Sequence, residues 1–386
     1  AFYLSRLVWD DSITGAGLPV VGFFAAGAFY LAIRSVDAKR AGLAAGRWIA
    51  PMAGSAVFCV LAILTRYAAV WIVPGILLYL GLSFGRAGRV ALPVFALLVL
   101  LGVSPWLVRN QVVSGSFLGM AHYTALYDSR LSDGDSLART THVPLKAGAV
   151  VNALQVKWLT KMSEYYRGRM GSLGEGLLVP FFFATFFFRF VRREVNLLRW
   201  ALALAMAGMF FAAGLFGDPV FRLLHVFWPL MILYGFAFFF LLLDRLAFEA
   251  RLANFAVGGA VVALSALPLI SGLLPPRTGL PYPPYFPTFI QKVCSHLEPN
   301  EVMCTDMPWA TAWYGSRISI YLPTSVEEFY QINDYQKTIK GLYFTTLTRD
   351  LPYARVLKTG AYKTWFPILE GRIPSDFPLT QGFHLN

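Results

Sequence analysis

The chain has 386 residues, of which 57% are hydrophobic and only 14% are charged. An average soluble protein carries about 25% charged residues, and this much apolar surface cannot be hidden in one water-soluble core. The composition therefore excludes a soluble globular protein, a disordered chain, a coiled coil and a disulfide-rich scaffold. It predicts an α-helical polytopic membrane protein with a small soluble appendage.

The net charge of +12 is explained by Lys and Arg that gather in cytoplasmic loops and beside anionic headgroups. The sequence offers no basic soluble domain, so we expect no nucleic-acid partner. Its three cysteines have neither metal-ligand spacing nor the pattern of a disulfide framework. The separation of Cys294 from Cys304 permits a bridge without implying one.

Apolar runs of nearly twenty residues predict spanning helices, because about 30 Å of hydrocarbon needs about 20 residues. About eight such runs occur. They are Ile13–Ile33, Ile49–Thr65, Tyr67–Leu82, Val90–Val108, Leu177–Phe190, Trp200–Gly217, Leu223–Leu243 and Phe255–Leu274. The expected domains are residues 1–274, with an outer loop at 110–174, and residues 275–386, a Pro-rich linker followed by a small extracytoplasmic α/β domain.

Basic residues in the short loops predict the orientation of these helices. Twelve of them fall on one side of the membrane, which we therefore assign to the cytoplasm. They are Arg34, Lys39, Arg40, Arg47, Arg86, Arg89, Arg189, Arg192, Arg193, Arg199, Arg245 and Arg251. The opposite short connections hold little beyond Arg66 and Arg222. The expected location is a bacterial cytoplasmic membrane, with the C-terminal domain outside the cytoplasm.

The chain begins with Ala1 and, on this orientation, begins outside. Because polytopic proteins commonly begin in the cytoplasm, we expect an upstream segment with an odd number of spanning helices.

The C-terminal region reads as alternating helices and strands. Residues Phe289–Leu297 are amphipathic, and Val302–Thr305, Ile318–Leu322 and Gly341–Leu347 are strand candidates, with a helical stretch at Val326–Ile339. This strand–helix–strand order favours a partly parallel sheet.

Polar residues at the outer helix ends are the main candidates for chemistry. Asp10 and Asp11 lie at the mouth of the first helix. Two adjacent carboxylates there suit a divalent metal (Mg, Mn or Zn) or acid–base work, although they also suit a solvated helix N-terminus.

Basic side chains on the same face are candidates for binding a lipid phosphate. Arg66 is expected at the tip of a tight hairpin, and Arg109 ends the fourth helix beside Trp106. Arg222 and His225, spaced i and i+3, share a helix face. Arg222 and His225 could instead steady a carboxylate. The ordinary alternatives are snorkelling to the headgroups for Arg66, an aromatic-plus-basic belt for Arg109, and an interfacial arginine paired with Asp218 for Arg222.

Two further segments have a functional and a structural interpretation. Residues Val151–Arg169 form a basic amphipathic pattern, which fits a helix lying on the membrane that either flanks a lipid-substrate entrance or covers the helix bundle. Trp309, Trp313 and Tyr314 suit stacking on sugar rings, and equally a core helix under a sheet.

Four motifs resemble those of the GT-C type membrane glycosyltransferases, specifically the bacterial relatives of protein O-mannosyltransferases and lipid A aminoarabinose transferases. They are Trp9-Asp-Asp-Ser-Ile-Thr-Gly15, Gly46-Arg47 leading through Leu61-Ala-Ile-Leu-Thr-Arg-Tyr67 to Pro74-Gly-Ile-Leu-Leu-Tyr79, Ser104-Pro-Trp-Leu-Val-Arg-Asn110, and Phe221-Arg-Leu-Leu-His-Val-Phe-Trp-Pro229. The resemblance covers about residues 1–245. Their order along the chain and their common placement on the outer face carry the resemblance.

The resemblance implies transfer of a sugar from a polyprenyl-phosphate donor to a protein, lipid or glycan acceptor on the outer face of the membrane. It implies that Asp11, with Asp10, corresponds to an acidic motif that acts in catalysis or holds a divalent metal. Arg66 and Arg222 correspond to positions that bind the donor phosphate, with Arg109 and His225 beside them. The family's first outer loop, with its main catalytic acid, would precede residue 1.

Two alternatives stay open: a transporter or flippase of a lipid-linked saccharide, and a non-catalytic subunit that binds glycan. A transporter would be expected to carry charges near mid-membrane and paired broken helices. The sequence places its charges at helix ends instead, which favours the enzyme.

Overall fold

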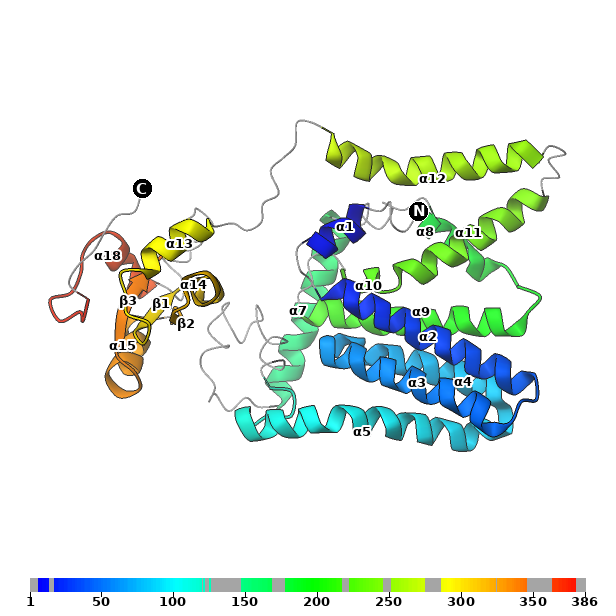
Figure 1. Cartoon of the computed structure of the whole chain (residues 1–386), viewed down its shortest axis with the longest axis horizontal. Helices are drawn as coiled ribbons and strands as arrows, with labels where there is room; N and C mark the ends of the chain where they lie inside the picture. Colours follow the sequence, from blue (N-terminus) through cyan, green and yellow to red (C-terminus); the bar gives the residue numbers. More distant parts are fainter. Residues whose placement is uncertain are drawn as a thin grey trace. The chain divides into compact units, whose positions relative to one another are not determined.

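The computed structural model describes residues 6–13, 17–119, 121, 125, 147–168, 178–216, 222–245, 251–274, 286–323, 325–345 and 363–379. The chain divides into two compact units. The first comprises residues 1–125 with 154–277, and the second comprises 126–153 with 278–386. Figure 1 shows the helices of the first unit and the sheet of the second.

The first unit is a helical bundle whose apolar helices identify it as a multi-pass membrane protein. Five stretches of the described chain are long and apolar enough to cross a membrane: Leu18–Arg40, Ala45–Thr65, Tyr67–Ser114, Arg193–Phe216 and Trp228–Arg245. The third of these, with 48 residues, holds two helices, α4 (Ile72–Phe84) and α5 (Gly88–Ser114). Gly85, at φ +57°, provides the left-handed turn between them, which a side chain would strain.

The other described helices of this unit are, in chain order, α1 (Arg6–Ile13), α2 (Leu18–Arg40), α3 (Ala45–Thr65), α7 (Ala147–Gly168), α8 (Leu178–Ala184), α9 (Arg193–Phe216), α10 (Arg222–His225), α11 (Trp228–Arg245) and α12 (Arg251–Leu273). The first residues of α7, up to 153, belong to the second unit. Helices α2 and α3 pack most extensively, α5 packs on α3 and α4, α9 packs on α4, and α11 packs on α8.

The prediction of eight spanning helices is not confirmed. The run expected at Leu177–Phe190 contains α8, which has seven described residues, and then a 3-10 turn before the chain extends at Phe188. The run expected at Leu223–Leu243 is divided into α10 and α11. Pro229 lacks the N–H that would bond to the carbonyl of His225, so the helix is interrupted there.

Small residues bring the helices close together, as is usual for membrane bundles. A Cβ added at Gly75 of α4 would lie 2.6 Å from the carbonyl oxygen of Ala201 in α9. Ser55 of α3 donates a 2.8 Å hydrogen bond to the carbonyl of Ala28 in α2, and Ser35 donates one of 2.6 Å to that of Trp48. Contacts of this kind hold the helices together inside a membrane, because no water is present there to drive hydrophobic association.

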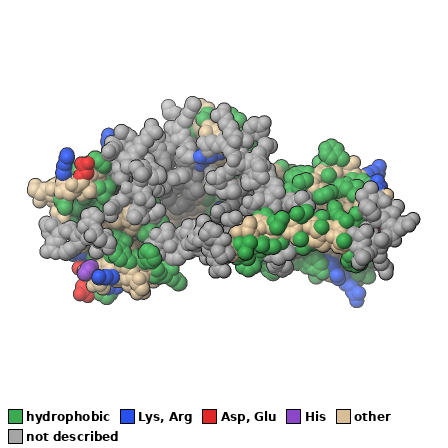
Figure 2. All heavy atoms as spheres, turned by 90° about the horizontal axis from the view of Figure 1, so that it is seen from above, with side chains coloured by type: hydrophobic (Ala, Val, Ile, Leu, Met, Phe, Trp, Pro, Cys, Tyr) green, Lys and Arg blue, Asp and Glu red, His purple; other side chains and the backbone are tan. Residues whose placement is uncertain are grey.

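Basic residues gather at one end of the bundle, which we call the basic end. Lys39 donates to the carbonyl of Phe84 at 2.9 Å and lies over the ring of the same residue at 4.1 Å. Arg40 forms a 2.8 Å ion pair with Glu194. The contacts show that the end of α2, the end of α4 and the start of α9 meet here. Figure 2 shows hydrophobic side chains along the visible helices of this unit, with Lys and Arg side chains at the right end of the view.

The second unit contains a three-stranded parallel sheet in the order β2-β1-β3, made of β1 (Val302–Thr305), β2 (Ile318–Tyr321) and β3 (Ile339–Tyr343). Its helices are α13 (Pro287–Cys294), α14 (Pro308–Gly315), α15 (Val326–Tyr335) and α18 (Phe366–Leu369).

Alternate residues of β1 face two separate apolar clusters. Val302 and Cys304 pack with Phe329 of α15 and with Trp365, whereas Met303 packs with α13 and α14. All four residues of β1 are buried, as expected for the central strand of a sheet covered on both faces. Cys294 belongs to the second cluster, so the sheet separates it from Cys304, and no disulfide joins the two.

Candidate functional site

A carboxylate and an imidazole meet at the end of the bundle opposite the basic end. Asp11 of α1 places Oδ2 2.8 Å from Nδ1 of His225 in α10. The two residues are 214 positions apart in the chain. Both side chains are largely withdrawn from solvent, with exposed fractions of 7% for Asp11 and 14% for His225. We call them the Asp–His pair.

The local sequence explains how His225 reaches this position. The interruption at Pro229 ends α10 directly after His225, and the backbone of Val226 packs against Gly22 near the start of α2. The imidazole also packs edge-on against Trp228, with ring centroids 5.7 Å apart. The indole and the carboxylate together hold the ring in one orientation.

The chemistry of such a pair is that of an oriented base. A carboxylate bound at one ring nitrogen fixes the tautomer of a histidine and makes the other nitrogen the one that exchanges a proton. Burial strengthens this contact, because water screens it less. The pair can therefore accept a proton from a substrate hydroxyl, with the carboxylate stabilising the imidazolium that forms.

A second polar cluster, the Tyr67 network, lies at the same end. The hydroxyl of Tyr67 accepts hydrogen bonds from Nε1 of Trp106 at 2.7 Å and from Nδ2 of Asn110 at 2.8 Å. Tyr67 begins the 3-10 turn that follows α3 and its C-cap, and a Cβ at Gly17 would lie 3.5 Å from Thr65, so the end of α3 meets the start of α2. The network ties the end of α5 to the α3–α4 connection.

Two arginines border this network, and both are exposed. Arg66 caps the C-terminus of α3 in an extended conformation. The guanidinium of Arg109 lies 4.8 Å from the ring centroid of Trp106, with Nη1 3.4 Å from Oδ1 of Asn110. A guanidinium held over an aromatic ring and open to solvent can bind a phosphate through two parallel hydrogen bonds.

The structure combines some of the predicted site residues and separates others. It joins Asp11 to His225, which the sequence had placed in different roles, and it puts Arg66 and Arg109 at the same end of the bundle. The side chains of Asp10 and Arg222 lie outside the described residues. Trp309, Trp313 and Tyr314 belong to α14 in the second unit.

Three polar residues of this region, Tyr67, Asn110 and Lys157, received no role from the sequence. Tyr67 and Asn110 are the last residues of two sequence segments that carry the family resemblance. Their positions directly after Arg66 and Arg109 are the signal by which the sequence could have indicated a role for them. Lys157 is 3% exposed and donates a 2.9 Å hydrogen bond to the carbonyl of Ala125. It lies on α7, whose Trp158 packs against Gly214 at the end of α9. Of the two interpretations of this helix, covering the bundle is the one its described contacts support.

Two side chains that can ligate a metal, Asp11 and His225, meet at this end of the bundle. In the part of the chain that the structure describes, no group of three His, Cys, Asp or Glu side chains gathers, and the side chain of Asp10 lies outside that part. The divalent metal expected at Asp10 and Asp11 stays a prediction. The role that we assign to the Asp–His pair follows from its hydrogen bond, which has the geometry of an acid–base group.

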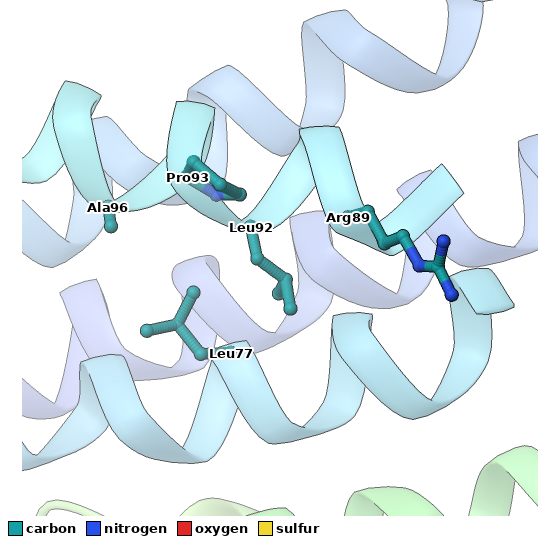
Figure 3. A pocket seen from close by; sticks show the side chains of 6 residues that line it. Leu77, Arg89, Leu92, Pro93 and Ala96 are labelled. Carbon is teal, nitrogen blue, oxygen red and sulfur yellow. The ribbon is translucent and has the colours of Figure 1, made fainter. Parts of the chain in front are cut away.

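A shallow groove of about 390 Å³ lies between α4 and α5, lined by Leu77, Gly88, Arg89, Leu92, Pro93 and Ala96. Figure 3 shows Leu77 and Leu92 facing each other in this groove and Arg89 at one end of it. Because Arg89 is the second residue of α5, the groove opens toward the basic end. It is thus separate from the Asp–His pair.

Comparison of the chain with protein-family models, with curated proteins and with solved structures finds no match.

Proposed function

We propose that the chain is an integral membrane glycosyltransferase that moves a sugar from a polyprenyl-phosphate donor to an acceptor on the outer face of a bacterial cytoplasmic membrane. The observation that carries the proposal is the Asp–His pair, a buried oriented base at the same end of the bundle as two exposed arginines.

The sidedness of the site supports the proposal. Basic residues of α2, α4–α5 and α9 gather at the opposite end, and basic loops face the cytoplasm in most polytopic proteins. The Asp–His pair would then face the outer leaflet, where sugars linked to polyprenyl phosphate are consumed. On this orientation the second unit, which follows α12, is extracytoplasmic.

The proposed reaction uses each group once. The Asp–His pair removes the proton from the acceptor hydroxyl as its oxygen forms a bond to the anomeric carbon of the sugar. The bond from that carbon to the donor phosphate oxygen breaks, and the electron pair leaves with the polyprenyl phosphate. Arg66 and Arg109 neutralise the charge that develops on the phosphate.

The positions of the charges favour an enzyme over a transporter. Each described charged residue of α2, α3, α5, α9 and α11 lies within about two turns of a helix end. Arg199, the most buried of them, donates to the backbone carbonyls of Thr185 and Phe188. It therefore supplies hydrogen bonds to carbonyl groups at the helix break after α8. A transporter of charged lipid-linked saccharides is expected to place such groups at mid-membrane.

The test measures sugar release from labelled polyprenyl-phosphate donors by the protein in liposomes. We expect release by the parent and a loss of about 100-fold in Arg66→Ala, because the arginine neutralises the leaving phosphate. Arg47→Ala, which removes an exposed arginine at the basic end, is the matched control and should keep the parental rate. Labelled lipid-linked sugar that crosses the bilayer without release would contradict the enzyme and support a transporter.

A further inference from the structure

The sheet of the second unit has the topology that creates a ligand site in α/β proteins. The chain leaves β1 through α14 to β2 on one side, then returns through α15 to β3 on the other. The order β2-β1-β3 places the second and third strands of the chain on opposite sides of the first, and ligands of open α/β sheets bind at the carboxyl ends of the strands where the order reverses in this way. In this sheet the corresponding position is the carboxyl end of β1 and β3, where Thr305 and Tyr343 are paired.

Polar side chains fix the geometry of that edge. Asp306 follows β1, is 7% exposed, and accepts hydrogen bonds from the backbone N–H of Thr345 at 3.0 Å and from its hydroxyl at 2.9 Å. The carboxylate thus ties the end of β1 to the segment after β3. The buried carboxylate of Asp306 therefore satisfies a backbone donor at this edge and fixes its conformation.

An exposed aromatic stack lies on the same edge. Trp309, in the first turn of α14, stacks on Tyr321, the last residue of β2, with ring centroids 6.2 Å apart and 24° between the planes. Both rings remain open, with exposed fractions of 54% for Trp309 and 39% for Tyr321. The sequence had grouped Trp309 with Tyr314, but Tyr314 packs against the cluster of α13 and α14.

We infer that the carboxyl edge of this sheet, with Trp309 and Tyr321 as its platform, binds a neutral saccharide. The negative ring face of an aromatic side chain attracts the C–H groups of a pyranose face. Assigning this saccharide as part of the acceptor rests on the proposed function, whereas the binding itself does not.

The composition of α14 favours a saccharide over a lipid surface. Membrane-surface helices carry Lys or Arg on the face that meets the headgroups, and α14 contains no charged residue. The position of Trp313 provides a way to distinguish saccharide binding from binding to a lipid surface. It is 80% exposed, but lies four residues further along α14, about 6 Å from Trp309 along the helix axis and away from the carboxyl edge.

The experiment titrates the full chain in nanodiscs with maltotriose, mannotriose and chitotriose, using saturation-transfer difference NMR. We expect at least one trisaccharide to bind the parent, with affinity about tenfold lower in Trp309→Ala and in Tyr321→Ala. Trp313→Ala, the control of the same type on the same helix, should bind as the parent does. Because no donor lipid is present, loss of transferase activity cannot produce this pattern.

Three results would overturn the inference. One is the absence of binding by all three trisaccharides to a parent whose thermal unfolding is cooperative. Another is an equal loss of affinity in Trp313→Ala. The third concerns binding to phosphatidylglycerol vesicles, measured with the protein in detergent micelles. If Trp309→Ala and Trp313→Ala both weaken this binding and leave saccharide binding unchanged, the exposed tryptophans belong to a membrane surface.

Discussion

At the scale of single residues, the sequence selects the polar groups of the site but does not pair them. Asp11 and His225 were recognisable because each interrupts the end of an apolar run. Their contact brings together the short helices α1 and α10, and nothing in local spacing reports a meeting across 214 residues. Tyr67 and Asn110 were not assigned a role, because a lone Tyr or Asn at a helix end is typical of any membrane interface.

The second unit provides a prediction for a single tyrosine at alkaline pH. Burial raises the pKa of the Tyr343 phenol, and the negative charges of Asp306 and Cys294 raise it further. Because the folded-state pKa is above the unfolded one, the neutral phenol stabilises the fold fully below the ordinary pKa of about 10. That stabilisation is lost progressively as the pH rises above 10.

The measurement is the thermal unfolding midpoint of the full chain in detergent at pH 8 and at pH 11. We expect the midpoint of the parent to fall more between these values than that of Tyr343→Phe. Tyr335→Phe changes a tyrosine that is 87% exposed in the same unit and should follow the parent. An equal fall in parent and Tyr343→Phe would show that Tyr343 does not contribute.

At the scale of elements, run length and hydropathy locate α2, α3, α5 and α9 well, since each crosses the bundle as one apolar helix. They fail at α8, where the apolar run continues but the helix does not. There Asn196 bonds to both the N–H and the carbonyl of Phe190, and Arg199 takes the carbonyl of Phe188. These side chains come from the next helix, so a hydropathy pattern contains no sign of the break.

Close contact between α4 and α9 gives a prediction about a glycine. A side chain at Gly75 would overlap the backbone of Ala201 and approach Cβ of Ala205. We expect Gly75→Val to lower the free energy of unfolding by about 1–3 kcal/mol or more, as overpacking of a core does.

The control is Gly259→Ala in α12, where an added Cβ meets nothing within 4 Å. It should be neutral or stabilise the helix by about 1 kcal/mol. Unfolding of the bundle in mixed micelles with increasing sodium dodecyl sulfate measures both variants. Equal stability of Gly75→Val and the parent would mean that α4 and α9 do not pack as closely as described.

At the scale of the whole molecule, composition was enough to indicate a helical membrane protein, and the twelve basic residues indicated two unlike ends. The structure brings several of those residues together at one end through contacts such as Arg40 with Glu194. Composition could not reveal that the site at the other end is assembled from α1, α3, α5 and α10, because assembly depends on helix packing.

The proposed orientation predicts which residues are reached from outside the cell. Ser114→Cys, at the end of α5, should react in intact cells with a membrane-impermeant maleimide. Gly46→Cys, at the basic end, should react only after permeabilisation. Both positions are exposed, and the three natural cysteines are buried, so their background is low. The reverse pattern of labelling would place the Asp–His pair in the cytoplasm and contradict the proposed function.

The central claim is that Asp11 and His225 act together as the base for sugar transfer, and a double-mutant cycle tests it most directly. The rate of sugar release is measured for the parent, Asp11→Asn, His225→Asn and the double variant, with Asp244→Asn, an exposed carboxylate at the basic end, as the control. We predict a loss of about 100-fold or more in each single variant, with no further loss in the double variant, because residues that act as a unit are not additive. Full activity in either single variant, or losses that multiply in the double variant while all proteins stay folded, would contradict the account.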